Sequence, residues 1–265
     1  LGDVYKRQDP KLRPPFLQEM TRTQRNAWHQ AYDPRNTRYR ELEKQGKLQG
    51  DERNLYVYQR FIKDYVRCID GLDAQIGRIL HLLEKEDLAE NTLLVYSSDE
   101  GFFTGEHGWA EKRWMYEESF KSPLLMRWPG VIEPGSVIRD LVQNIDLAPT
   151  FLQAAGLDVP STLHGLALQP LFSESGPKEW REEVLYQYFD GGTLQKPGPY
   201  NMPRHEGIRN RRYKLISFYE YDAWEFYDLR NDPNELKNLI GDPLMKSRIQ
   251  WMKQRLLKLK SKFSL

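Results

Sequence analysis

The chain has 265 residues, of which 39% are hydrophobic and 12% are aromatic, a composition typical of a protein that folds around a core. Its 39 lysine and arginine residues against 38 acidic ones give a net charge of +1, so no overall field favours nucleic acid or an anionic membrane as a partner. A single cysteine, Cys68, excludes an internal disulfide and a thiolate zinc site. No stretch of the sequence approaches the ~18 consecutive apolar residues of a transmembrane segment.

Residues 9–50 predict an irregular, polar lead-in with a short helix near Thr23 to Ala31. Residues 1–8 (LGDVYKRQ) resemble a translated adapter or assembly scar, so we treat them as a non-native lead and exclude them from the fold prediction. From Glu52 to Lys85, apolar residues recur at spacings of three and four, which predicts a long helix with one buried face. Cys68 lies within this helix, and we expect its thiol to be buried.

A strand is predicted directly after this helix. The run from Asn91 to Ser98 is apolar without alternation, as expected of a parallel strand covered on both faces. A second strand is predicted from Pro123 to Trp128, and Asp146 is expected to cap a helix that continues through Ala155. This order predicts an α/β fold with a mostly parallel sheet flanked by helices, in which ligands bind beyond the carboxyl ends of the strands.

After about Pro170 the sequence changes character. Aromatic, β-prone segments separated by polar turns predict a small antiparallel sheet, at Val184–Phe189, Tyr213–Tyr219 and Trp224–Leu229. A basic helix is predicted from Leu244 to Lys262. We therefore place a domain boundary between residues 9–175 and a small α+β subdomain at 176–265.

The acidic residues after the first predicted strand suggest a binding site. Asp99 and Glu100 are adjacent, and in a poorly hydrated cleft they would repel each other unless a cation neutralised them. A hard divalent ion with oxygen ligands would do so, and solvated loop acids are the alternative. Lys112 favours the site, because an ammonium group near a bound cation suits a place where both face one dense anion, such as sulfate or phosphate.

Several motifs, in order along the chain, closely resemble the type I sulfatases, the formylglycine-dependent members of the alkaline phosphatase superfamily. They are SSDEG at 97–101, GEHG at 105–108, KRWMYEES at 112–119, WPG at 128–130 and NIDLAPT at 144–150. The segments GIR at 207–209 and WEFYDL at 224–229 are similar to the small C-terminal domain of that family. The resemblance covers nearly the whole chain after residue 50, is greatest to bacterial glycan sulfatases, and implies that residues 9–175 are the C-terminal half of the sulfatase α/β domain.

The resemblance implies a metal and an anion contact. Asp99 would bind Ca²⁺, with Mg²⁺ the less expected ion, and Glu100 would be a second ligand at a position where the family usually has Asn, His or Gln. Lys112 would be catalytic, because it matches the lysine that contacts the sulfate oxygens and stabilises the charge on the departing group.

The resemblance also implies substrate contacts. His107 would line the site, with a histidine that only hydrogen-bonds the backbone as the alternative. Arg204 and His205, in a predicted loop before Gly207, would reach the glycan, and a solvated basic turn is the alternative. That alternative applies more strongly to the neighbouring basic residues, Arg209, Arg211, Arg212 and Lys214.

The nucleophile of the family is formylglycine, made from the cysteine of a C-x-P-S-R or related motif, and this sequence contains no such motif. Cys68 is followed by Ile-Asp-Gly within a predicted helix and does not match it. We therefore expect the chain to be the C-terminal part of a longer enzyme, with the formylglycine in the missing N-terminal part, and to be inactive alone. By the same resemblance the intact protein would be periplasmic or secreted.

The sequence thus predicts a sulfatase fragment whose intact protein hydrolyses O-sulfate esters of carbohydrates. Two alternatives remain open. A phosphonate or phosphodiester hydrolase of the same superfamily would share Asp99 and Lys112. A non-catalytic module that binds sulfated glycans would need neither.

Overall fold

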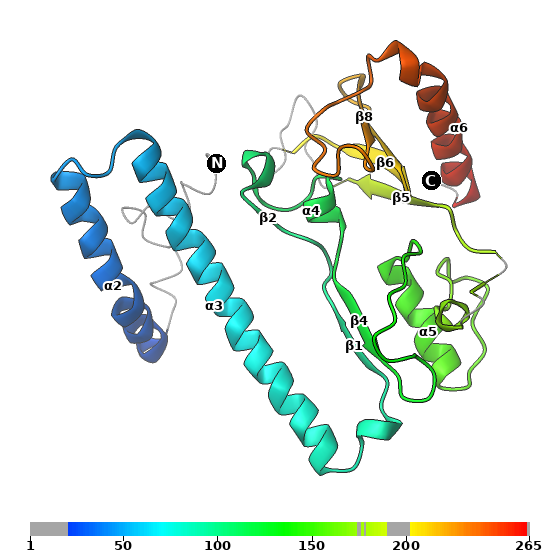
Figure 1. Cartoon of the computed structure of the whole chain (residues 1–265), viewed down its shortest axis with the longest axis horizontal. Helices are drawn as coiled ribbons and strands as arrows, with labels where there is room; N and C mark the ends of the chain where they lie inside the picture. The colour runs from blue at the N-terminus through cyan, green and yellow to red at the C-terminus, as the bar shows by residue number, and fades with distance from the viewer. Residues whose placement is uncertain (1–20, 174–175, 178, 190–201, 264–265) are drawn as a thin grey trace. The chain divides into compact units, whose positions relative to one another are not determined.

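A computed structural model of the chain describes residues 21–173, 176–177, 179–189 and 202–263. The chain divides into two compact units, which Figure 1 shows in colours that run from blue to red along the chain. The first unit comprises Leu1–Ala89 and Phe102–Glu111, and the second comprises Glu90–Gly101 and Lys112–Leu265. The predicted lead at residues 1–8 lies outside the described residues, and the boundary proposed at 175/176 stays a prediction.

The first unit is built on two helices, α2 (Arg22–Lys44) and α3 (Gly50–Lys85), which lie side by side in Figure 1. Helix α2 begins at Thr21 with a capping box formed with Gln24, and it is much longer than the predicted helix at Thr23–Ala31. The sequence did not reveal the full length of α2 because the helix has few apolar residues. Polar contacts help to hold it: the Arg60 guanidinium of α3 donates to the Asn36 side chain at 2.8 Å.

Helix α3 is confirmed almost to the residue, but its predicted burial is wrong. Within the part of the chain that the structure describes, Val57 is the only buried residue of α3. Cys68 is exposed, so the prediction of a buried thiol is also wrong. Large apolar side chains along the helix are exposed as well, namely Leu55, Val66, Ile69, Leu72, Ile79 and Leu82. Periodicity predicts that a helix has an apolar face, but it does not show that another element covers that face.

The second unit begins with the two predicted strands, which follow a short 3-10 turn at Ala89–Asn91. Strand β1 (Leu94–Ser97) pairs with β4 (Leu124–Arg127), with Leu94 opposite Arg127 and Ser97 opposite Leu124. The pair is antiparallel, whereas we expected a mostly parallel sheet. An unbroken apolar run indicates a strand with little solvent contact, but it carries no information about the direction of the partner.

A short helix, α5 (Leu147–Ala154), follows the 3-10 turn Asn144–Asp146. Asp146 lies at the N-cap position, yet its side chain makes no capping hydrogen bond to α5, which corrects the predicted role. Instead its fully buried carboxylate accepts from the backbone N–H of Gln143 at 2.7 Å and of Leu166 at 2.8 Å, and pairs with the Arg181 guanidinium. Asp146 therefore ties the chain on both sides of α5 together. A further 3-10 turn spans Gln169–Phe172.

The predicted C-terminal sheet and helix are confirmed. Among the described residues, four strands form an antiparallel sheet in chain order, and Figure 1 shows helix α6 lying across it. The strands are β5 (Glu183–Tyr188), β6 (His205–Asn210), β7 (Tyr213–Phe218) and β8 (Ala223–Asp228), and α6 (Lys246–Lys262) follows a 3-10 turn at Pro243–Met245. Strand β6 was not predicted. It begins at His205, which we had placed in a loop, and Arg204 directly precedes it.

The sheet packs on both faces. One face lies against α6, where Ile208, Leu215 and Phe226 form a core with Met252 and Leu256. The other face lies against residues 114–120, which include the short helix α4 (Glu117–Phe120). Gly207 in β6 permits this approach, because a Cβ there would come within 2.3 Å of the Met115 sulfur. The sheet thereby holds the segment that follows Lys112.

Candidate active site

The site predicted at the end of β1 begins with Asp99 and Glu100. Asp99 is exposed, and its carboxylate accepts from the Ser98 hydroxyl at 3.2 Å. The next residue, Gly101, donates its backbone N–H to the Ser119 carbonyl oxygen at 2.9 Å. A Cβ at Gly101 would lie 2.1 Å from the Glu118 carbonyl oxygen, so only glycine permits this contact. The end of the strand is therefore joined to the backbone of α4.

Lys112 and Glu100 meet at this site. The Lys112 ammonium forms an ion pair with the Glu100 carboxylate, and the side chains are 35% and 32% exposed. The sequence motifs suggested that Lys112 lies near the acids after β1, and the structure brings its ammonium group to Glu100. Because both groups reach solvent, an incoming anion can contact Lys112 without first entering a closed interior.

A second ionic cluster, which the sequence analysis missed, lies beneath the segment after Lys112. The Lys214 side chain is fully buried, and its ammonium contacts Glu117 at 2.9 Å and Glu235 at 2.8 Å. It also donates to the Met115 carbonyl oxygen at 2.6 Å. Arg209 binds Glu117 through two hydrogen bonds of 2.9 and 3.0 Å, so two cations and two carboxylates share this site.

Burial and the neighbouring cations together set the pKa values of these carboxyl groups. Burial alone would raise the pKa of Glu117, but Lys214 and Arg209 outweigh it and hold that pKa at about 2. For Glu235 burial prevails over the attraction of Lys214 and raises the pKa to about 6. The Glu235 carboxylate also accepts from the Glu117 backbone N–H at 2.7 Å. The sequence held a signal for this cluster. In the predicted strand Lys214 lies on the same face as Ile216 and Phe218, so a charged side chain is expected among apolar ones.

The two predicted glycan contacts of the C-terminal subdomain have different surroundings. Arg204 is partly exposed and lies 3.9 Å from the Glu220 carboxylate. His205 is fully buried at the start of β6, and one ring nitrogen lies 2.9 Å from the Pro203 carbonyl oxygen. Aromatic rings surround it at centroid distances of 5.4 to 5.7 Å, from Trp114, Tyr186, Tyr188 and Phe218. Burial lowers the pKa of His205, which favours a neutral ring.

His107 belongs to the first unit. It lies in the 3-10 turn Glu106–Gly108, between β2 (Phe103–Thr104) and β3 (Ala110–Glu111), which pair with each other. Its backbone φ of 53° is in the left-handed region, and its ring meets the Phe103 ring edge-on at 6.0 Å. Its role as a substrate contact stays a prediction.

The described residues provide only part of a metal site. They contain no group of three or more His, Cys, Asp or Glu side chains placed to hold an ion. Asp99 fits a ligand role, because its carboxylate is exposed at the end of the strand. Glu100 is engaged by Lys112. Calcium binds ~6 to 8 oxygens, so further ligands would have to come from elsewhere.

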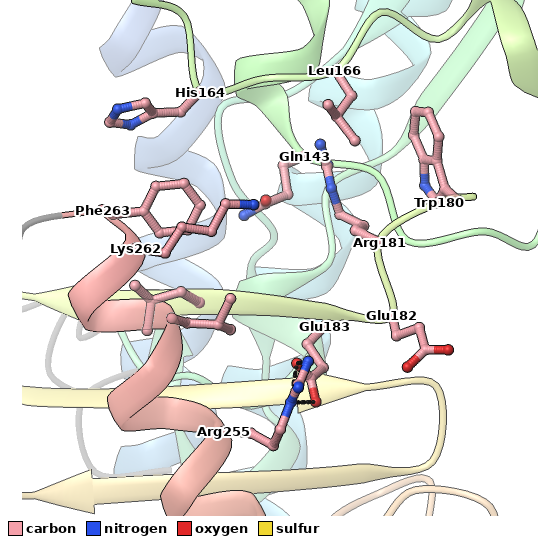
Figure 2. A pocket seen from close by; sticks show the side chains of 12 residues that line it. Gln143, His164, Leu166, Trp180, Arg181, Glu182, Glu183, Arg255, Lys262 and Phe263 are labelled. Carbon is pink, nitrogen blue, oxygen red and sulfur yellow. Dashed lines mark hydrogen bonds and ion pairs between the residues drawn. The ribbon is translucent and has the colours of Figure 1, made fainter.

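A cavity of about 330 Å³ lies elsewhere in the second unit, and no residue predicted for the site lines it. Figure 2 shows its walls, which include His164, Trp180, Lys262 and Phe263. The two arginines in its wall are neutralised: Arg181 pairs with Asp146, and Arg255 binds Glu183 through hydrogen bonds of 2.6 to 2.9 Å. The cavity therefore has no strong net charge that would attract a sulfated ligand.

Comparison with known proteins assigns the chain to the sulfatases of the alkaline phosphatase superfamily. A family model described as "Sulfatase" matches residues 15–157, and one described as "N-sulphoglucosamine sulphohydrolase, C-terminal" matches residues 105–262. Each match covers more than half of the chain, which therefore belongs to the sulfatase family.

Within the described residues, no helix is long and apolar enough to cross a membrane.

Individual proteins show which members of the superfamily this chain is similar to. An N-acetylglucosamine-6-O-sulfatase of Bacteroides thetaiotaomicron is 41% identical over 219 residues, which are 82% of this chain and 38% of that protein. A protein solved with its substrate D-glucosamine-2-N,6-O-disulfate is similar with a TM-score of 0.83 and 37% identity, over 94% of this chain and 49% of that one. A phosphonate monoester hydrolase of Agrobacterium radiobacter has a TM-score of 0.64 and 28% identity, over 73% and 40%. The chain thus spans less than half the length of these relatives.

Proposed function

We propose that the protein containing this chain hydrolyses O-sulfate esters of carbohydrates, and that its substrate is N-acetylglucosamine sulfated at the 6-oxygen. The observation that carries the proposal is the meeting of Lys112 with Glu100 beside Asp99 at the end of β1. The sugar is proposed by similarity to the Bacteroides thetaiotaomicron sulfatase, which is 41% identical to this chain.

The residues of this chain would act on the sulfate group. Lys112 binds the sulfate oxygens and stabilises the negative charge that grows as the ester bond breaks. Glu100 holds the Lys112 ammonium near the strand end before the anion arrives. Asp99 would be a ligand for a divalent cation, Ca²⁺ by preference, and that cation would supply further positive charge to stabilise the sulfate.

The remaining machinery would come from outside this chain. No cysteine of this sequence has a formylglycine motif, so the formylglycine that supplies the nucleophile belongs to another part of the enzyme.

Arg204 and His107 are proposed to contact the sugar. His205 is buried, and we propose that it shapes the aromatic surroundings of Trp114, two positions after Lys112.

A substrate comparison on the full-length enzyme tests this function. We expect turnover of N-acetylglucosamine 6-sulfate to exceed that of a phosphonate monoester, and we expect the isolated 265-residue chain to turn over neither. EDTA should abolish turnover, and added Ca²⁺ should restore it. Faster hydrolysis of the phosphonate would instead support the alternative that the phosphonate hydrolase neighbour suggests.

A matched pair of lysine variants separates catalysis from simple binding. Lys112→Ala should lower turnover by ~10² to 10³-fold, whereas Lys121→Ala, a change at an exposed lysine nine positions later, should leave it intact. Binding of the sulfated sugar that survives both Lys112→Ala and EDTA, without turnover in the wild type, would support a non-catalytic glycan-binding module.

A further inference from the structure

The backbone is strained on both sides of Lys112. Glu111 has φ 82° and Arg113 has φ 95°, values that residues with a side chain rarely adopt. Such a conformation is unfavourable and persists only where its surroundings enforce it. The conformation next to Lys112 must therefore be held by specific contacts.

Side-chain contacts hold the backbone of Arg113 in this conformation. Its backbone N–H donates to the Ser119 hydroxyl oxygen at 2.8 Å, and its carbonyl oxygen accepts from the Tyr186 hydroxyl at 2.8 Å. Both polar groups of the peptide backbone at Arg113 are thus bound by side chains. Ser119 is buried in α4, and Tyr186 lies in the interior of β5.

Tyr186 is itself well fixed. In the sheet it is paired with Gly207 of β6, and its ring meets the Phe120 ring edge-on at 5.5 Å. Burial raises the pKa of its hydroxyl, so the group remains protonated and can donate a hydrogen bond throughout the physiological range. Such a donor on a rigid strand can fix the backbone that it binds.

We propose that Tyr186 is a positioning residue for Lys112: by holding the Arg113 carbonyl oxygen it fixes the backbone next to Lys112 and directs the ammonium toward Glu100 and the sulfate. Tyr186 of the C-terminal sheet thereby supports catalysis by acting through Lys112. This inference rests on the proposed role of Lys112 in sulfate ester hydrolysis.

Tyr186→Phe removes only the hydroxyl, and the ring remains to fill the same space. In the full-length enzyme it should lower kcat/KM for N-acetylglucosamine 6-sulfate by about tenfold, because a small displacement of a charge-stabilising group has a large effect on the transition state. Tyr213→Phe is the matched control, since Tyr213 packs on the opposite face of the sheet against α6. It should change kcat/KM by less than about twofold.

A double-mutant cycle shows whether Tyr186 acts through Lys112. In a Lys112→Ala background, or in Lys112→Arg if alanine leaves no measurable turnover, the effect of Tyr186→Phe should largely disappear. An undiminished effect in that background would overturn the inference. If Lys112→Ala itself left turnover unchanged, the proposed function of Lys112 would fail instead, and the two failures are thus distinct.

A labelling experiment on the 265-residue chain needs no turnover. An amine-reactive succinimidyl ester is added, and modification of individual lysines is followed by peptide mass spectrometry. Tyr186→Phe should increase labelling of Lys112 several-fold and leave the fully buried Lys214 unlabelled, whereas Tyr213→Phe should change neither. Equal labelling of Lys112 in the wild type and Tyr186→Phe, or increased labelling of both lysines, would count against positioning.

Discussion

Lys112 and Lys214 are both paired with glutamate within one unit of the protein, but in opposite environments. Lys112 and its partner Glu100 are each about one third exposed, whereas the side chains of Lys214 and its partner Glu235 are fully buried. Water screens the first pair and is absent from the second. The exposed pair can therefore exchange partners when an anion arrives, while the buried cluster can only hold the structure together.

The difference predicts that catalysis and stability depend on different lysines. An exposed ion pair contributes ~0 to 1 kcal/mol, because solvation of the separated charges nearly equals their attraction. Removing one partner of a buried pair leaves an uncompensated charge and costs ~3 to 5 kcal/mol. A functional site must be of the first kind if its cation is to bind substrate.

Lys112→Met should produce the largest effect on activity. We expect kcat of the full-length enzyme to fall by ~10² to 10³-fold, because the cation that offsets transition-state charge is lost. The free energy of unfolding, from urea titration of the same variant, should change by less than ~1 kcal/mol. A loss of activity that only accompanied unfolding would contradict this division of roles.

Lys214→Met should produce the largest effect on stability. The free energy of unfolding should fall by ~3 to 5 kcal/mol, since Glu117 and Glu235 would remain buried beside each other without Lys214. Urea titration of the 265-residue chain measures this change. Lys85→Met, at a 69% exposed lysine of α3, provides the control and should be nearly neutral.

Much of the architecture could be predicted because it depends on local patterns. The periodicity of α3 and the alternating aromatic residues of β5, β7 and β8 are properties of short segments. Strand β6 escaped prediction because its sequence, HEGIRN, is as polar as a turn. Gly207 in this strand is needed because Met115, which is distant in sequence, approaches it closely.

The proximity of Lys112 to the acids after β1 could be predicted from the sequence, but the contacts that position Lys112 could not. The order of motifs placed Lys112 with the acids that follow β1, and the structure brings Lys112 to Glu100. The contacts that hold Lys112 in place join residues far apart in sequence, such as Tyr186 to Arg113. Burial of His205 and Lys214 likewise depends on the segment that covers the sheet. The direction of β1–β4 pairing also depends on tertiary structure.

The buried cluster should also make stability depend on pH through Glu235. Its pKa is about 6 in the folded protein against an ordinary 4.5, so the folded state binds the proton more tightly. The stabilising contribution of Glu235 is therefore complete below pH 4.5 and lost as pH rises through 6. Glu117, with a pKa of about 2, contributes in the opposite sense: its contribution is present above pH 4.5 and lost as pH falls toward 2.

Glu235→Gln isolates this effect, because the amide oxygen can still accept from the Glu117 N–H while the titrating proton is gone. Between pH 4.5 and 6.5, the free energy of unfolding of the variant should rise relative to that of the wild type. Urea titrations at pH 4.5, 5.5 and 6.5 would test it, and a constant difference between the two proteins would show that Glu235 does not titrate in this range.

Glu100→Gln should have the smallest effect and decides the role of Glu100 in the exposed pair. If Glu100 holds Lys112, its neutralisation frees the ammonium for sulfate, and KM should fall by up to about fivefold, the equivalent of an exposed ion pair of ~1 kcal/mol. The Ca²⁺ concentration that gives half-maximal activity should not change. If Glu100 is instead a metal ligand, that concentration should rise, as it should in Asp99→Asn. Calcium titrations of the two variants therefore show whether the carboxylate next to Asp99 binds the metal or the lysine.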